Sequence, residues 1–134
     1  MGKARVRTTS QGVTLDTGAL IALERGDGRM IALLQQGLKR GASFRVPAGV
    51  VGQAWRGGKR QAILARFLRA REVQIVSLDE PLARACGELC RCTDTADVID
   101  ASVVLVASKH QDPVITSDPE DLRRLAPRST LLEV

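Results

Sequence analysis

Residues 13–20 have the sequence VTLDTGAL, in which a short run of apolar and β-branched residues ends at Asp16. The run predicts a buried strand, and apolar residues at three- and four-residue spacing predict a helix over Ala19–Arg25. We predict four further strands at Phe44–Val46, Val73–Val76, Val114–Thr116 and Thr130–Val134, and further helices at Met30–Arg40, Pro47–Trp55, Gln61–Arg71, Pro81–Cys90, Ala96–Lys109 and Pro119–Leu125. This alternation indicates a three-layer α/β/α fold with a mostly parallel sheet covered on both faces.

The length of 134 residues suits a single domain with its own core. We expect residues 1–12, which are basic and polar, to form a flexible arm, and residues 13–134 to form the domain. We find no apolar run long enough for a membrane span or a signal peptide. Three cysteines, Cys86, Cys90 and Cys92, are an odd number and fit a reducing cytoplasm better than a disulfide framework. We interpret them as small, buried or half-buried thiols on a helix.

The net charge of +5 is unevenly distributed, because the segment from Gly28 to Arg71 contains no Asp or Glu. Its basic residues are Arg29, Lys39, Arg40, Arg45, Arg56, Lys59, Arg60, Arg66, Arg69 and Arg71. Such a segment either attracts a polyanion such as nucleic acid or forms a solvated basic face. Aromatic residues are limited to Phe44, Trp55 and Phe67, too few for a typical base-stacking RNA-binding module. An RNA partner would therefore be held largely through its backbone.

Four aspartates stand where an open α/β sheet builds its functional site. Asp16 and Asp118 each follow a predicted strand, and functional groups gather beyond the carboxyl ends of parallel strands. Each also precedes a helix, so helix capping explains either residue equally well when it is taken alone. Asp97 and Asp100 lie near the start of a helix that is apolar nearly all round. Capping also fits Asp97, but Asp100 is beyond capping reach and needs a cation or hydrogen-bond partners if it is buried.

Three or four carboxylates at one sheet edge would repel one another unless a cation neutralised them. Hard oxygen ligands suit Mg²⁺ or Mn²⁺, which are often completed by substrate phosphate oxygens. An acidic site within a basic protein is the arrangement that metal-assisted hydrolysis of a polyanion requires. The residues therefore predict such a hydrolase.

Three elements together resemble PIN domains in kind, order and spacing. They are LDTGAL at residues 15–20, Asp100-Ala101 leading an apolar helix, and Thr116-Ser117-Asp118 closing a strand. The likeness covers nearly the whole chain, and within the family it is closest to VapC-type toxins. The resemblance implies an endoribonuclease that uses Mg²⁺ or Mn²⁺. It also implies the toxin of a toxin–antitoxin pair, usually a homodimer, inhibited by a cognate antitoxin.

The resemblance also assigns the site residues. Asp16, Asp100 and Asp118 match the family's acidic positions and are expected to be catalytic and to bind the metal. Asp97 is expected to be a further catalytic residue, as an additional ligand or by orienting one. Thr116 is expected to hydrogen-bond to the carboxylates, as is its neighbour Ser117.

One residue departs from the family pattern. Gln53 stands where the family usually carries a glutamate, and a glutamine cannot act as a general base. We favour the hypothesis that Asp97 compensates; weaker binding of a second metal and reduced activity remain open.

Two alternatives are of other classes. A phosphatase of the haloacid dehalogenase kind needs a second aspartate where Gly18 stands, and a receiver domain needs an acidic pair and a late lysine that are not evident. A PIN module that binds RNA or a partner protein without cutting it is the more serious alternative.

Overall fold

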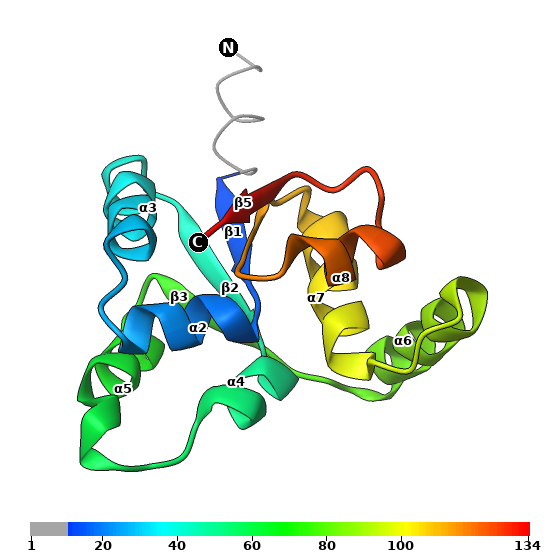
Figure 1. Ribbon diagram of the computed structural model, residues 1–134, viewed down its shortest axis with the longest axis horizontal. Helices are drawn as coiled ribbons and strands as arrows, with labels where there is room; N and C mark the ends of the chain where they lie inside the picture. Colours follow the sequence, from blue (N-terminus) through cyan, green and yellow to red (C-terminus); the bar gives the residue numbers. More distant parts are fainter. Residues whose placement is uncertain (1–10) are drawn as a thin grey trace.

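The computed structural model describes residues 11–134 (Figure 1). Five parallel strands form one sheet in the order β3-β2-β1-β4-β5. The strands are β1 (Gly12–Leu15), β2 (Ser43–Pro47), β3 (Val73–Val76), β4 (Val114–Thr116) and β5 (Leu131–Glu133). The helices are α2 (Thr17–Glu24), α3 (Gly28–Lys39), α4 (Ala48–Ala54), the 3₁₀ turn η1 (Lys59–Gln61), α5 (Ala62–Arg69), α6 (Glu80–Thr93), α7 (Val98–His110) and α8 (Pro119–Leu125).

The predicted single-domain α/β fold is confirmed, and the element boundaries differ by few residues. Pro47 ends β2 instead of opening the next helix, and the helix predicted from Gln61 begins as a 3₁₀ turn. The arm predicted over residues 1–12 lies outside the described residues, apart from Gln11 and Gly12. Gly12 already belongs to β1, where it pairs with Ser43 of β2.

Helices cover the sheet on both sides. In Figure 1 the sheet runs between α2, α3 and α5 on one side and α6, α7 and α8 on the other. Helix α2 packs on β1 and β4, and α7 packs on β1, β2 and β4. The core between these layers contains Leu15, Leu20, Phe44, Val103 and Ile115, all at most 1% exposed. The buried, nearly all-apolar α7 that its sequence predicts is therefore confirmed.

Strand order places β1 and β4 side by side in the middle of the sheet. From β1 the chain proceeds outward through β2 and β3, whereas β4 and β5 lie on the other side of β1. The order thus reverses between β1 and β4, and in open parallel sheets ligand sites form beyond the carboxyl ends of the strands at such a point.

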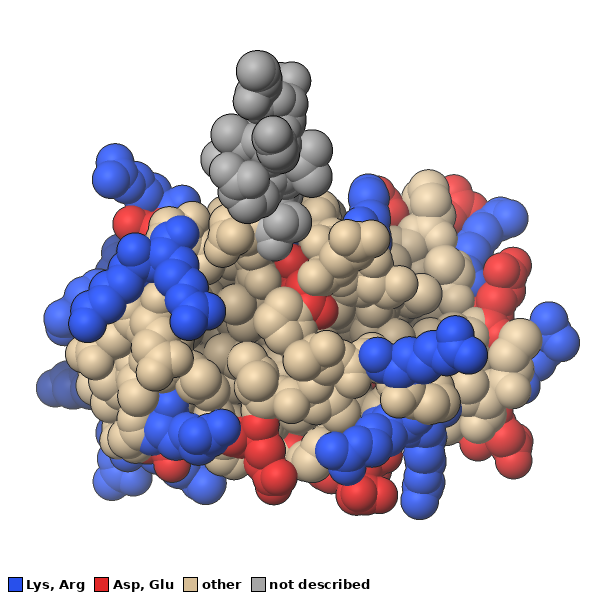
Figure 2. Space-filling model, turned by 90° about the horizontal axis from the view of Figure 1, so that it is seen from above, with Lys and Arg blue, Asp and Glu red and all other residues tan. Residues whose placement is uncertain are grey.

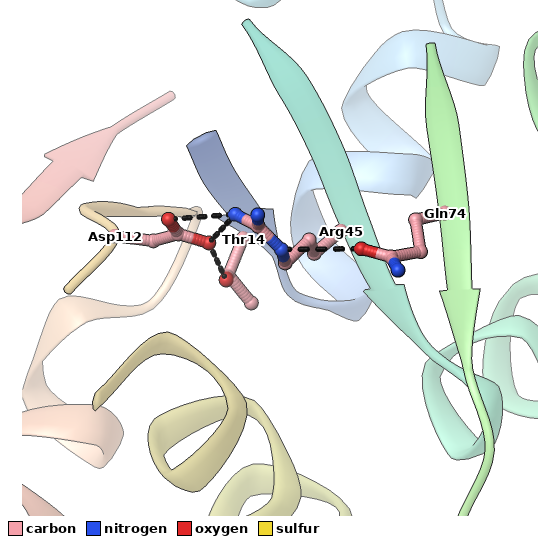
Figure 3. A network of polar contacts seen from close by, with 4 residues as sticks. All are labelled: Thr14, Arg45, Gln74 and Asp112. Carbon is pink, nitrogen blue, oxygen red and sulfur yellow. Dashed lines mark hydrogen bonds and ion pairs between the residues drawn. The ribbon is translucent and has the colours of Figure 1, made fainter. Parts of the chain in front are cut away.

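A polar row that is buried at Thr14 and Asp112 crosses three strands (Figure 3). Arg45 of β2 is the register partner of both Thr14 in β1 and Gln74 in β3. Its Nη1 lies 2.8 Å from both carboxylate oxygens of Asp112, and its Nε donates to Gln74 Oε1 over 3.2 Å. Thr14 Oγ1 donates to the same carboxylate over 2.8 Å. The side chain of Asp112 is 0% exposed and that of Arg45 is 12% exposed, so this ion pair is buried.

The cysteines behave largely as predicted. Cys86 and Cys90 share the buried face of α6, where they pack against Ala101 of α7. Cys92 differs because it is exposed, and all three thiols are free. Among residues 11–134, none of the helices combines the length and apolar character that crossing a membrane requires.

Candidate active site

Asp16 lies directly beyond β1 and forms the N-cap of α2. Its Oδ1 accepts a hydrogen bond of 2.9 Å from the Ala19 backbone N–H, and the residue is only 7% exposed. Burial raises the pKa of the Asp16 carboxyl, and the nearby charge of Asp118 raises it further, while hydrogen bonds from Thr116 and from backbone N–H groups oppose the shift. Asp16 is thus both a helix cap and a buried carboxylate beside a second acid.

Thr116, at the end of β4, links the ends of the two central strands. Its side chain is a hydrogen-bond partner that lowers the pKa of the Asp16 carboxyl, and its Oγ1 accepts from the Asp118 N–H over 2.9 Å. Thr116 thus lies beside Asp16, as expected. Ser117 packs closely against Gly18, and within the described residues its side chain makes no hydrogen bond to a carboxylate.

Asp97 and Asp100 lie at the start of α7. Asp97 is exposed and caps the helix, since its Oδ1 accepts from the Asp100 N–H over 2.9 Å. Burial raises the pKa of Asp100 to about 7, helped by the charges of Asp97, Asp16 and Asp121 and by a hydrogen bond to Asp97. Four carboxyl groups, two of them at the start of α7, therefore act on one another at this edge of the sheet.

Asp118 and Asp121 lie at the start of α8. Asp118 is exposed, and although it is the N-cap residue, its side chain makes no capping hydrogen bond in the part of the chain described. A hydrogen bond to Asp118, together with that residue's charge, raises the pKa of Asp121. Sequence reasoning missed Asp121. The signal was present, because Asp118 and Asp121 are three residues apart at a helix start, as are Asp97 and Asp100.

A small cleft connects these two helix starts. It has a volume of about 180 Å³ and is lined by Thr95, Ala96, Asp97, Asp100, Asp121, Arg124 and Leu125. Acidic groups thus dominate the polar part of its wall, with one arginine beside them.

The donor set suits a hard divalent cation. The carboxylates raise one another's pKa, so a cation among them would relieve an existing repulsion. Within residues 11–134, however, no three acidic, histidine or cysteine side chains come close enough to hold an ion by themselves. Because like charges repel, the acids do not gather around one point. Asp100 hydrogen-bonds to Asp97 at the start of α7, and Asp121 hydrogen-bonds to Asp118 at the start of α8. Mg²⁺ usually keeps several waters and takes only one or two protein carboxylates, so these residues fit it without forming a closed cage.

Gln53 lies on α4 at the border of this acidic group. Its Oε1 accepts a hydrogen bond from the hydroxyl of Thr17, the residue that follows Asp16. The side chain is exposed and carries no charge. A neutral amide therefore lies against Thr17, the residue next to Asp16.

The raised pKa of Asp100 predicts how stability depends on pH. Its ordinary pKa is 3.8, so between about pH 4 and 7 the folded protein retains a proton that the unfolded chain has lost. The stability that this group contributes is complete below pH 4 and is lost as the pH rises through 7. Asp100→Asn removes the effect. We expect it to stabilise the metal-free protein by roughly 2 kcal/mol at pH 8 and much less at pH 4.5, allowing for partial exposure.

Thermal unfolding in EDTA at the two pH values measures this difference. Glu120→Gln, an exposed acid on the same helix as Asp121, is the matched control and should change little at either pH. An equal effect of Asp100→Asn at pH 4.5 and pH 8 would contradict the assignment.

Residues 13–127 match the sequence model of the PIN domain. The chain belongs to the PIN-domain family. Domains of this family are in general nucleases, which hydrolyse nucleic acid. No curated protein sequence matches this PIN domain closely enough to count as a relative.

Solved structures agree with the PIN fold. The VapBC2 complex of Rickettsia felis bound to a promoter DNA fragment has a TM-score of 0.68 at 15% identity, covering 92% of this chain and 98% of that one. A toxin–antitoxin complex from Klebsiella pneumoniae has a TM-score of 0.65 at 18% identity, covering 91% of this chain and 99% of that one. FitAcB from Neisseria gonorrhoeae has a TM-score of 0.62 at 17% identity, covering 90% of this chain and 96% of that one. At these identities the likeness establishes the fold of the PIN domain.

Proposed function

We propose that this PIN domain is a metal-dependent endoribonuclease that acts as the toxin of a toxin–antitoxin pair. One observation carries the catalytic part of the proposal. Asp16, Asp100 and Asp118 come from three separate elements to the edge where β1 and β4 end. The charge of Asp118 raises the pKa of Asp16, and the charge of Asp16 raises the pKa of Asp100. The toxin role is supported by structural likeness to complexes that are themselves VapBC and toxin–antitoxin assemblies.

In this proposal Asp16, Asp100 and Asp118 would bind Mg²⁺ or Mn²⁺ in part through the waters that the ion retains. The ion, when bound, would lower the pKa of a bound water, so that hydroxide could attack the phosphorus, and would stabilise negative charge on the phosphate. Thr116 fixes the Asp16 carboxylate through its hydroxyl and holds the backbone of Asp118 at the same time. Asp97 is proposed to orient Asp100 through the hydrogen bond between their carboxyl groups.

The substrate is proposed to be RNA, held largely through its phosphates. Figure 2 shows basic side chains prevailing at the left end of the molecule, on the side where Figure 1 draws α3 and α5. At the opposite end, over α6 and α8, basic and acidic side chains are mixed. Helices α3 and α5 of the acid-free segment from Gly28 to Arg71 thus lie on this side of the molecule, and a basic face raises the local concentration of a polyanion.

The proposed partners follow from the toxin role. A cognate antitoxin would inhibit the enzyme by covering the acidic site, and the chain would form a homodimer in the cytoplasm. These parts of the proposal rest on family membership and on the assemblies that similar folds form.

Cleavage of labelled structured RNAs, including tRNAs, tests the proposal. The purified chain, freed of any antitoxin, is incubated with Mg²⁺, with Mn²⁺ or with EDTA. We expect cutting within the RNA in both metals and none in EDTA. Cutting that is indifferent to EDTA would contradict the metal dependence, and removal of nucleotides only from the ends would contradict an endonuclease.

A silent RNA-binding or protein-binding PIN module is the second candidate. The observation that favours it is Gln53, whose neutral amide lies beside Thr17 where an acid would complete the site. RNA that binds equally with and without metal, and is never cut, would support this candidate against the enzyme.

A further inference from the structure

An apolar groove lies outside the acidic site, between α4 and α5. It has a volume of about 430 Å³ and is lined by Val51, Trp55, Ala65, Leu68 and Arg69. This volume is in the range of small-molecule sites, which begin near ~300 Å³. Trp55 is 40% exposed although it is the largest apolar side chain of the protein. An aromatic ring left at the surface beside an arginine calls for a partner with a flat face and a negative charge.

The segment that carries Trp55 is fixed in place by Gln61. The Oε1 of this 5% exposed glutamine accepts from the N–H groups of Arg56 and Gly57 over 2.7 and 2.8 Å. Its Nε2 donates to the Ala54 carbonyl over 2.8 Å and to Glu24 over 3.0 Å. All four hydrogen-bonding positions of the amide are thus used, three of them on residues that flank Trp55 and the fourth on Glu24 of α2. The ring is therefore presented by an ordered segment, which lowers the entropy cost of binding.

Among the described residues that line the groove, the one charged side chain is that of Arg69, which is basic. Arg66 is exposed on the same helix, and Arg56 and Lys59 are exposed between α4 and α5. The sequence from Gly28 to Arg71, which includes the groove residues, contains no acid. Glu24 of α2 lies near this segment, and its Oε1 accepts a hydrogen bond from Gln61. An apolar floor with an arginine at its edge complements a nucleotide, whose base is flat and whose phosphate is negative.

We infer that this groove binds one unpaired base of the RNA, stacked on Trp55, with a neighbouring phosphate held by Arg69. The inference rests on the proposed function for the identity of the polymer. Groove and acidic site are connected by α4, because Gln53, two residues before Trp55, hydrogen-bonds to Thr17 next to Asp16. A strand anchored on Trp55 would therefore be led toward the carboxylates.

The fluorescence of Trp55 tests the inference directly. Trp55 is the only tryptophan and the chain has no tyrosine, so its emission reports on this groove alone. The full chain carrying Asp16→Asn is titrated, in EDTA, with a short single-stranded oligoadenylate and with an abasic strand of the same length. We expect saturable quenching by the oligoadenylate and none by the abasic strand, which offers phosphates without bases.

Binding of the same two labelled strands, measured by anisotropy, supplies the matched comparison. Trp55→Leu is expected to weaken binding of the oligoadenylate about 5- to 100-fold and to leave the abasic strand unaffected. Arg69→Ala is expected to weaken both. Trp55→Phe, which keeps an aromatic face, should recover part of the loss and guards against a Trp55→Leu protein that fails to fold.

The possible outcomes separate this inference from the proposed function. Unchanged fluorescence together with full affinity of Trp55→Leu would overturn the base site and leave the groove to a protein partner. If the chain also cuts RNA in a metal-dependent way, only the base site is rejected and the proposed nuclease stands. Base-specific quenching in a chain that never cuts RNA would support the base site and remove the nuclease.

Discussion

Asp16→Asn is expected to lower the rate of metal-dependent RNA cleavage at least about 100-fold without unfolding the protein. The substitution removes the charge of the most buried acid of the site, and loss of a group that holds a metal typically costs this much or more. The fold should survive because asparagine is as good an N-cap as aspartate and can accept the Ala19 N–H bond. Initial cleavage rates in Mg²⁺ and thermal unfolding without metal measure the two effects.

Two further substitutions place this loss on a scale. Gln53→Ala should reduce cleavage only a few-fold, because a neutral amide cannot act as a general base. Asp97→Ala should cost clearly more than Gln53→Ala if Asp97 compensates for the missing glutamate; equal, small losses would reject that hypothesis. An Asp16→Asn protein that cuts at the rate of the unaltered chain would refute the acidic site itself.

Asp112→Ala is expected to destabilise the fold by about 3–5 kcal/mol without touching the acidic site. The change leaves the Arg45 guanidinium buried without its carboxylate and removes the acceptor of the Thr14 hydroxyl. For a domain of this size we expect the melting temperature to fall by roughly 10–20 °C. Denaturant or thermal unfolding in EDTA measures the loss.

The double variant Arg45→Met with Asp112→Ala is the control for this prediction. It removes the unpaired charge as well, so it should regain a substantial part of the lost stability. A double variant no more stable than Asp112→Ala would show that the loss came from a cavity or from Thr14 instead of the buried charge. Exposed pairs such as Arg84–Glu80 should by contrast change stability by less than ~1 kcal/mol.

Much of the fold could be predicted from local patterns. Apolar runs ending at Asp16 and Asp118 identified β1 and β4, and the apolar stretch behind Asp100 identified the buried α7. These features are local because a strand or helix shows its buried face through its own residue spacing. Helix starts were predictable for the same reason, since an N-cap bond spans only three residues, as from Asp79 to Leu82.

The sequence by itself also determined the chemical character of the candidate site, because hard oxygen ligands and an acid-free basic segment are properties of composition and spacing. Tertiary structure alone decided which groups meet. The adjacency of β1 and β4 brings Asp16 to Thr116, and the bond from Thr14 to Asp112 joins residues 98 positions apart. It also decided that Asp121 lies with the other carboxyl groups of the site, and that Gln61 is buried and hydrogen-bonded to residues that flank Trp55. The physical reason is that strand order depends on how all the helices and strands pack around one core, and the spacing of residues within a single element contains no information about that packing.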